Sequence, residues 1–212
     1  MLYWNTVDRL LKDTLILLMG SPEFSEFRLV GGTSLSLQLG HRMSVDIDLF
    51  TDAPYGSVDF DVIDQFLKNN FNYVDTSFGI LQGMGRSYLV GNDANNSIKL
   101  DVYYTDDFIQ PSLIREDIRM ATIEEIIAMK IDVIARGGRK KDFWDIHELL
   151  NNYDILQMLT LHQQRYPYNH DEEMILVAFK AFRKADNDFE PVCLHGKHWE
   201  FIKLDIINAL KN

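Results

Sequence analysis

Apolar and polar positions recur with a helical period at the start of the chain and with a strand period soon afterwards. Residues 3–19 carry apolar side chains at helical spacing, which predicts an amphipathic helix. An apolar run over Phe27–Val30 ends at Gly31-Gly32 and predicts a strand that stops at a tight turn. A helix is predicted over 33–39. Asp46 to Phe50 then alternates acidic and apolar residues, which is the period of a half-buried strand.

The middle of the chain continues the same mixture of helix and strand. An apolar stripe predicts a helix over Val58–Asn69. Three strand-like runs follow it, namely Phe71–Phe78, Arg86–Gly91 and Ser97–Tyr104. Turn-forming residues at 93–96 predict a hairpin between the last two runs.

The pattern changes near residues 105–121, after which helical periods prevail. Thr122 and two glutamates predict the start of a helix that runs to Arg136 and stops at Gly137-Gly138. Further helical patterns cover Phe143–Asn151, Ile155–Gln164, Glu172–Lys184 and Trp199–Leu210. The fold class is therefore α+β. We expect a core over residues 1–120, with a mixed β-sheet and flanking helices, and a helical domain over 121–212 that contributes to the active-site cleft.

Composition and charge narrow the classes of protein that fit this pattern. The hydrophobic content of 46% is ordinary for a soluble globular protein, and the longest apolar stretch near the N-terminus, Leu15–Met19, is too short for a membrane span or a signal sequence. The single cysteine, Cys193, suits a reducing compartment. We therefore expect a cytoplasmic protein with no membrane partner. The formal net charge of −11 disfavours broad nonspecific binding to nucleic acids.

Three aspartates on strand-like segments carry the candidate chemistry. Asp46 and Asp48 are two residues apart, so they share one face of a strand, and Asp101 lies on the polar side of a later strand. If the two strands are neighbours, the three carboxylates converge, and their mutual repulsion implies bound cations. Oxygen ligands favour Mg²⁺ or Mn²⁺, and a sparsely liganded Mg²⁺ is commonly shared with a nucleoside triphosphate (NTP).

The turn at Gly31-Gly32-Thr33-Ser34 complements these aspartates. Glycines allow the backbone to approach a phosphate closely, the amides that open the next helix can bind its oxygens, and the two hydroxyl groups add further donors. Thr33 is also a candidate helix N-cap. A Gly-Gly turn or an Asp-x-Asp pair alone is commonly a plain turn or a solvated strand face, so the interpretation depends on their order and spacing.

The segment LVGGTSLSLQLGHRMSVDIDLF (Leu29–Phe50) resembles the first motif of the AbiEii/AbiGii-type nucleotidyltransferase toxins, which belong to the DNA polymerase β-like superfamily of minimal nucleotidyltransferases. The resemblance implies a Gly-Gly turn, an Asp-x-Asp metal pair and a third strand carboxylate, which match Gly31-Gly32, Asp46/Asp48 and Asp101. It spans roughly residues 25–150 and leaves residues 151–212 unmatched.

The resemblance also implies a later helical lysine and a basic segment with two aspartates. Lys130 matches the lysine, and Asp142 and Asp145 match the aspartates. Lys130 would reach a triphosphate, while Asp142 and Asp145 would orient Lys130 or Arg139, with helix capping as an alternative role for Asp142. Arg42 is expected near phosphate at the rim of the site.

Several further residues were weighed as candidates for chemistry. His41 is expected to be a surface-loop histidine. Cys193, His195 and His198 fall short of a zinc signature. The one strongly basic cluster of the sequence has two interpretations, a phosphate or RNA site and a solvated loop; it comprises Arg136, Arg139, Lys140 and Lys141.

These residues together predict transfer of a nucleotidyl group from an NTP to an acceptor hydroxyl, with Mg²⁺ held by the three aspartates. The resemblance implies a toxin of a toxin–antitoxin or phage-defence pair, with RNA such as tRNA as acceptor, a cognate antitoxin, and GTP as one candidate NTP. Two alternatives stay open: a nucleotidyltransferase that modifies a small cationic molecule such as an antibiotic, and a catalytically silent nucleotide-binding module.

Overall fold

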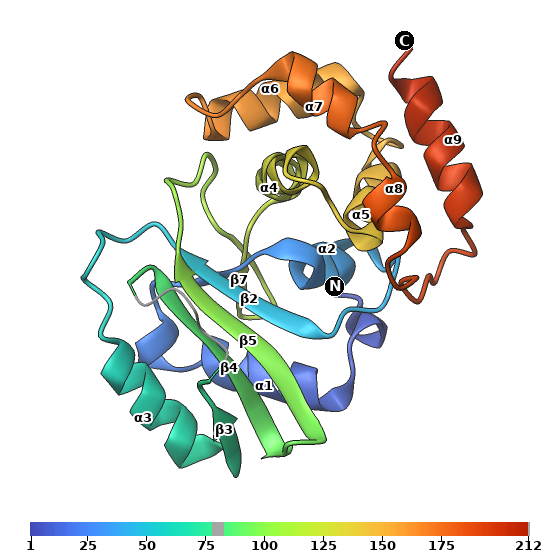
Figure 1. The fold of residues 1–212 in the computed structure, drawn as a ribbon. Helices are drawn as coiled ribbons and strands as arrows, with labels where there is room; N and C mark the ends of the chain where they lie inside the picture. The colour runs from blue at the N-terminus through green and yellow to red at the C-terminus, as the bar shows by residue number, and fades with distance from the viewer. Residues whose placement is uncertain (78–82, 212) are drawn as a thin grey trace.

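The computed structural model describes residues 1–77 and 83–211 of the chain (Figure 1). A seven-stranded mixed sheet has the order β3-β4-β5-β2-β1-β7-β6. The strands are β1 (Arg28–Leu29), β2 (Asp46–Thr51), β3 (Tyr73–Asp75), β4 (Gly85–Asp93), β5 (Asn96–Tyr104), β6 (Leu113–Arg115) and β7 (Ile118–Met120). The pairs β2–β5 and β1–β7 are parallel, and the remaining neighbours are antiparallel.

The described part of the chain has nine α-helices. They are α1 (Arg9–Met19), α2 (Gly31–Leu39), α3 (Phe60–Asn70), α4 (Ile123–Ala135), α5 (Lys140–Leu149), α6 (Ile155–Arg165), α7 (Glu172–Ala178), α8 (Arg183–Asp186) and α9 (Trp199–Ala209). The later helices pack on α4 and α5 rather than on the sheet. The mixed sheet followed by a run of helices confirms the predicted α+β class. Within residues 1–77 and 83–211, every helix is too short or too polar to cross a bilayer.

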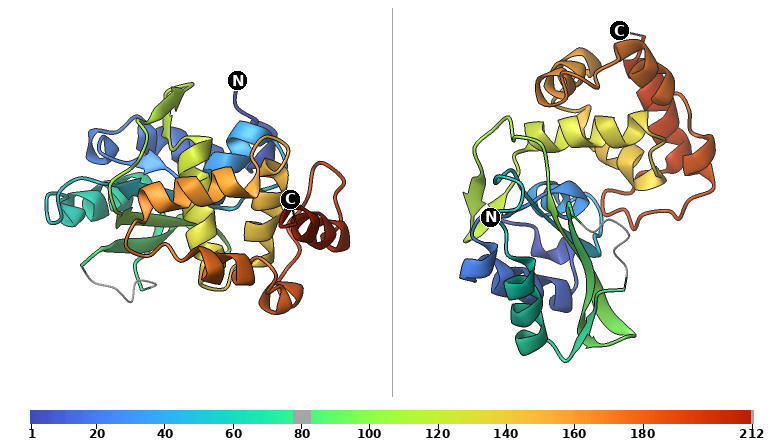
Figure 2. Two further views of the ribbon diagram at one scale, coloured as in Figure 1. Left: turned by 90° about the horizontal axis from the view of Figure 1, so that it is seen from above. Right: turned by 60° about the vertical axis from the view of Figure 1, so that its left-hand side comes forward.

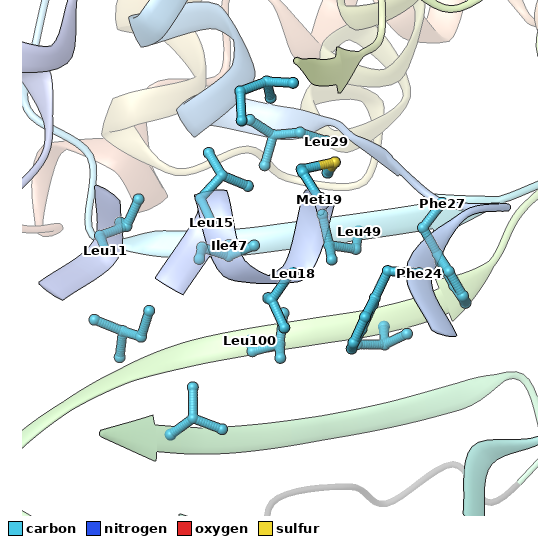
Figure 3. Packing of buried hydrophobic residues seen from close by; sticks show 14 of the residues in the cluster. Leu11, Leu15, Leu18, Met19, Phe24, Phe27, Leu29, Ile47, Leu49 and Leu100 are labelled. Carbon is cyan, nitrogen blue, oxygen red and sulfur yellow. The ribbon is translucent and has the colours of Figure 1, made fainter. Parts of the chain in front are cut away.

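The first hydrophobic core lies between the sheet and helices α1 and α3. Figure 3 shows Leu15 and Leu18 of α1 lying over Ile47 and Leu49 of β2, and all four side chains are fully buried. Burial of each such side chain stabilises the fold by about 1.5–3 kcal/mol relative to exposure. Because the odd-numbered residues of β2 face this core, its even-numbered residues project from the opposite face of the sheet.

A second core joins the later helices to that opposite face. Trp144 of α5 and Trp199 of α9 stack with ring centroids 6.3 Å apart at its centre. Val30 and Leu35, which belong to the β1–α2 segment, are buried in the same cluster. The views in Figure 2 show α4 to α9 gathered on this side of the molecule. The division into domains at residue 120 stays a prediction, and the second core draws residues from both sides of it.

Several boundaries differ from the sequence expectation for local physical reasons. The first predicted helix is split, because Asp8 caps α1 by accepting from the amide of Leu11 at 2.7 Å after a separate short 3₁₀ turn. The helix expected from Thr33 begins instead at Gly31, with Val30 as its N-cap. The hairpin of β6 and β7 was not predicted, and the helix expected over 172–184 is divided into α7 and α8. Phe78, at the end of one predicted strand, lies outside the described residues.

Candidate active site

The parallel pairing of β2 with β5 brings the predicted aspartates onto one face of the sheet. Asp48 lies directly opposite Asp101 in the register, and Asp46 lies opposite Lys99. Ile47, Leu100 and Val102 point to the buried face instead, where each is 0% exposed. The neighbouring strands that the sequence argument required are therefore present. Helices α2, α4 and α5 lie on one side of the sheet (Figure 1), and the carboxylates face that side, since Asp46 pairs with Lys141 of α5 and Asp48 lies against Gly31 of α2.

The surroundings of the Asp48 carboxyl group oppose its ionisation. Burial, together with the charges of Asp101 and Asp46, raises its pKa to about 6. Lys141 and Lys99 oppose this shift without cancelling it. A carboxylate that is costly to ionise beside two others has a strong electrostatic preference for a bound cation.

Lysines engage the other two carboxylates. Lys141 Nζ lies 3.3 Å from Asp46 Oδ2, and Lys99 Nζ donates to Asp101 Oδ2. Ser87 Oγ donates to Asp101 Oδ1 at 2.6 Å and lies 2.9 Å from the hydroxyl of Tyr103. Within residues 1–77 and 83–211, no three His, Cys, Asp or Glu side chains are gathered closely enough to hold a metal ion. The three-carboxylate metal site therefore stays a prediction. A metal ion bound there would have to displace Lys141 from Asp46 and Lys99 from Asp101.

The Gly-Gly turn lies against the aspartates because of its backbone conformation. Gly31 has a φ of +67°, and a Cβ added there would lie 2.6 Å from Asp48 Oδ2. The amide of Val30 donates to the carbonyl of Asp48 at 2.9 Å, which fixes β1 beside β2. A Cβ at Gly32 would collide with the guanidinium of Arg42. A side chain at either position would displace Asp48 or Arg42, and the amides that open α2 lie next to the Asp48 carboxylate.

The two hydroxyl groups of the turn point elsewhere. Thr33 is 1% exposed, and its Oγ1 donates to the backbone carbonyl of Asp46 and lies 2.8 Å from Ser44 Oγ. Ser34 is fully buried and accepts from the amide group of Gln38 at 3.2 Å. Thr33 therefore ties α2 to the start of β2. The expectation that either hydroxyl binds phosphate stays a prediction.

Lys130, Asp142 and Asp145 meet in one buried ion-pair network. Lys130 Nζ lies 2.7 Å from Asp142 Oδ1 and 2.6 Å from Asp145 Oδ2. Arg42 also binds Asp145, with Nε at 2.6 Å and Nη2 at 2.8 Å. Although burial opposes ionisation, Arg42 and Lys130 hold the pKa of Asp145 well below its usual range. The expected pairing of both aspartates with Lys130 is present, and contact between Lys130 and a triphosphate stays a prediction.

His41 was expected on the surface, and this prediction is wrong. The residue is 1% exposed, and its Nε2 lies 2.8 Å from Asp145 Oδ1. Arg42 is equally buried at 2% exposed. Both residues lie before β2 and are drawn inward by Asp145 of α5, which the sequence places more than a hundred positions away. Local polarity alone could not have indicated this burial.

The basic cluster is dispersed rather than gathered. Arg136 pairs with Asp132, Lys140 is buried with its Nζ 5.6 Å from the ring of Trp199, and Lys141 faces Asp46. Asp142 also accepts from the amide of Arg139 at 3.0 Å, so it caps α5 as well as binding Lys130. The two roles weighed for Asp142 are both present.

Residues 192–195 contact the loop before β2, and no local sequence pattern predicts this contact. The amide of Met43 donates to the carbonyl of Val192, and the amide of Leu194 donates to the carbonyl of His41, each at 2.9 Å. His195 pairs with Glu148 at 3.1 Å. The segment containing Cys193 and His195 is thus an anchor for the loop before β2.

Some residues of the site were overlooked although a signal existed. Lys99 and Tyr103 lie two positions before and after Asp101, and Phe50 lies two positions after Asp48. Strand periodicity places all of them on the face of the aspartates. Ser87 reaches Asp101 through the β4–β5 register, which the sequence did not provide.

Comparisons with known proteins agree with this geometry. The profile of the family described as "Nucleotidyl transferase AbiEii toxin, Type IV TA system" matches residues 16–212. An uncharacterised protein of Aquifex aeolicus (strain VF5) is 28% identical over 209 residues, which cover 89% of this chain and 90% of that protein.

Two solved structures share the fold. JHP933 from Helicobacter pylori has a TM-score of 0.57 at 17% identity, covering 94% of this chain and 88% of its own. MenT4, a nucleotidyltransferase toxin from Mycobacterium tuberculosis H37Rv, has a TM-score of 0.53 at 15% identity, covering 92% of this chain and 83% of its own. The likeness extends over both the sheet and the helical half.

Proposed function

Because the chain belongs to the AbiEii nucleotidyl transferase toxin family, we propose that its nucleotidyl transfer takes place on the face of Asp46, Asp48 and Asp101. The observation that carries the proposal is the parallel register that sets Asp48 opposite Asp101, with Gly31 packed directly against Asp48. A phosphate bound at the amides of Gly31 and Gly32 would lie beside both carboxylates.

The donor set fits a hard divalent cation. Asp46, Asp48 and Asp101 would hold Mg²⁺ or Mn²⁺ through oxygen atoms, and the raised pKa of Asp48 is the electrostatic signature of a site that favours positive charge. When bound, the metal would neutralise charge on the phosphoryl oxygens during displacement. Lys141 and Lys99 are positioned to neutralise the same carboxylates when no metal is present.

The side chains around the aspartates have separate roles in the proposed transfer. An acceptor hydroxyl oxygen forms a bond to the α-phosphorus of the NTP, the bond from that phosphorus to the bridging oxygen breaks, and pyrophosphate leaves. Asp101 is the candidate to accept the hydroxyl proton, with Ser87 holding its orientation. The amides of α2 and Lys141 stabilise the triphosphate. Lys130, Asp142 and Asp145 act by positioning Arg42 and the start of α5.

The proposal extends to the acceptor and to the biological role of the protein. We infer a toxin that modifies RNA such as tRNA, uses an NTP with GTP as one candidate, and is neutralised by a cognate antitoxin. The toxin family supports this role. A second candidate acceptor is a small cationic molecule, which is favoured by a cleft of about 600 Å³ whose lining includes Asp52, Asp106 and Asp107.

Label transfer tests the proposed reaction. Each of the four NTPs, labelled at the α-phosphate, is incubated with the protein, Mg²⁺ or Mn²⁺, and either total RNA or a mixture of aminoglycosides. Label in RNA supports the RNA acceptor, and label in the aminoglycosides supports the small-molecule alternative. Asp48→Asn is expected to abolish transfer. Transfer that persists in this variant would move the reaction away from the aspartate face.

A silent nucleotide-binding module would give a different result. Transfer would be absent with every NTP, while calorimetry would still detect binding of Mg²⁺ and NTP to the wild type. Unchanged affinity in Asp48→Ala would further mean that the aspartate face does not hold the metal.

A further inference from the structure

The two ends of β2 differ sharply in the side chains around them. Beside Asp46, a hollow of about 360 Å³ is lined by residues that include Arg42, Arg139 and Lys141. Lys141 Nζ lies 3.3 Å from Asp46 Oδ2, which places its charge at the edge of the carboxylate group. Asp188 and Glu190 also line this hollow, and Asp188 Oδ2 accepts from the backbone amide of Lys140 at 3.2 Å. This end of the strand is where cations stand closest to the aspartates.

The other end of β2 opens into a larger cleft of about 760 Å³, which is lined mostly by apolar and aromatic side chains. Phe50 forms part of its floor, and it lies on the same face as Asp48, one pleat further along the strand. Met129 and Val133 of α4 form one wall, and Met174 of α7 forms another. The ring of Phe50 is held edge-on to Tyr103 with centroids 6.2 Å apart.

One side of α4 is devoted to this cleft. Met129, Asp132, Val133 and Arg136 all line it, and their spacing places them on a single stripe of the helix. Lys130 points away from the stripe, toward Asp142 and Asp145 of α5. Asp132 and Arg136 form an ion pair at the cleft, in which the Arg136 side chain is 72% exposed. The pair offers an acceptor and several donors next to an apolar floor.

We propose that the NTP lies along β2, with its polyphosphate toward Lys141 and Arg139 and its nucleoside in the cleft beyond Phe50. The inference rests on the proposed function, in which the α-phosphorus is attacked beside Asp48. Because the α-phosphorus lies between the β-phosphate and the nucleoside, these two parts must leave the aspartates in different directions. Charge assigns the polyphosphate to the cationic end. The apolar end receives the base, which stacks on Phe50 and presents its edge to Asp132 and Arg136.

The acidic lining of the cleft favours a nucleoside over a nucleic-acid strand as its ligand. Asp106, Asp132 and Asp171 all contribute to it, and among the lining residues within 1–77 and 83–211 Arg136 is the one cation. A phosphodiester chain would be repelled by this excess of carboxylates, whereas a nucleoside carries no charge of its own. The occupant that fits the cleft is therefore the uncharged end of the NTP.

Binding without turnover tests this orientation with two probes. One is an NTP analogue with a methylene group between the α- and β-phosphorus atoms, and the other is inorganic tripolyphosphate, each with Mg²⁺ and measured by calorimetry. Val133→Trp, which fills the cleft, is expected to weaken the analogue about tenfold or more, since base stacking contributes about 1–3 kcal/mol. The affinity of the Val133→Trp variant for tripolyphosphate should stay within about twofold of the wild-type affinity. Lys141→Gln weakens both probes in parallel.

Matched variants control for the added bulk. Val62→Trp introduces the same side chain on α3, against the other face of the sheet, and should leave both affinities unchanged. If Val133→Trp does not fold, Met174→Trp fills the cleft from an exposed position, with Val177→Trp on the same helix as its control.

The outcomes separate this inference from the proposed function. If Val133→Trp weakens both probes equally, or leaves the analogue unaffected, the orientation is wrong while the reaction can still be detected by label transfer. If the wild type binds neither probe, the NTP site on this face is wrong, and the orientation is wrong with it. A loss of affinity for the analogue, but not for tripolyphosphate, in the cleft variants supports the proposal.

Discussion

Asp48 is held in a position that opposes its own ionisation. It is packed against Gly31 on one side and faces Asp101 across the β2–β5 pairing on the other. Burial and the charges of Asp101 and Asp46 raise its pKa to about 6, so the folded protein binds its proton more tightly than the unfolded chain does. In the absence of metal, the ionised form therefore destabilises the native state at neutral pH.

Replacing Asp48 with asparagine should stabilise the metal-free protein while abolishing transfer. Above pH 6 the wild type carries the unfavourable charge and the variant does not, so we expect a gain of about 1–2 kcal/mol, smaller than the full pKa difference because solvent reaches the group. The gain should shrink to a small fraction of this value by pH 4 and vanish at lower pH, as both folded and unfolded Asp48 become protonated. Chemical denaturation at pH 8 and pH 4 measures it, and an equal gain at both values would contradict the assignment.

Gly31 offers a second test at the scale of a single residue. Alanine at Gly31 must adopt a φ of +67° and also meets Asp48 Oδ2 at 2.6 Å, whereas alanine at Gly56, with φ +85°, meets no atom within 4 Å. Both variants should lose about 1 kcal/mol to backbone strain. Gly31→Ala should in addition lose most of the transfer activity, and Gly56→Ala should retain it. Equal activity in the two variants would mean that close packing at Gly31 is unimportant for the reaction.

At the scale of elements, strand periodicity predicted more of the site than helical patterns did. The alternation over Asp46–Phe50 correctly placed two aspartates on one face, because side-chain direction in a strand follows from residue number alone. The start of α2 was mispredicted at Thr33, since the hydroxyl of Thr33 finds the backbone of Asp46 rather than its own helix. A hydrogen bond to a distant segment is a tertiary property that local propensity does not contain.

The same limit explains the buried network before α5. The family resemblance predicted that Asp142 and Asp145 would orient Lys130 or Arg139, and both aspartates pair with Lys130. The participation of His41 and Arg42 could not be predicted, because it depends on how α5 packs against the loop before β2. The residues after 151 likewise gave no local motif, although Val192 anchors that loop through backbone bonds that any sequence could form.

Asp145 is expected to be the most sensitive position of this network. Its carboxylate is 0% exposed and binds Arg42, Lys130 and His41, so Asp145→Asn leaves two buried cations with a weakened partner. We expect a loss of about 3–5 kcal/mol in the free energy of unfolding. Asp13→Asn, which removes an exposed ion pair with Arg9, should have almost no effect.

The pH dependence of that loss follows from the direction of the pKa shift. The pKa of Asp145 is well below its usual range in the folded protein, so its stabilising contribution is fully present above the unfolded pKa of about 3.9. The contribution is lost as the pH falls through the lower, folded value. Urea denaturation between pH 3 and pH 7 should therefore show a constant difference from wild type that narrows only at the acidic end. A difference that narrows already between pH 5 and 7 would contradict the network.

At the scale of the whole molecule, the two hydrophobic cores are interlocked rather than merely adjacent. Val30 and Leu35 follow directly from a strand of the sheet yet are buried in the second core. The segment after β5 is clamped by Glu125 of α4, which accepts from the amides of Ile109 and Gln110 at 2.9 and 3.1 Å. Arg165 of α6 forms a fully buried pair with the same glutamate. Unfolding of the second core would therefore remove the hydrogen bonds of Glu125 to the segment after β5 and the packing around Val30 and Leu35.

This interlocking predicts a single cooperative unfolding transition. Trp4 packs against the first core, whereas Trp144 and Trp199 lie in the second, so Trp4→Phe leaves a protein whose indole fluorescence reports the second core alone. In urea, that fluorescence and the far-ultraviolet circular dichroism of the same variant should have coincident midpoints. If the helical half were an independent domain, its fluorescence would change at a different urea concentration from the remaining secondary structure. Arg165→Met, which leaves Glu125 buried without its cation, should separate the two midpoints by loosening the clamp between the cores.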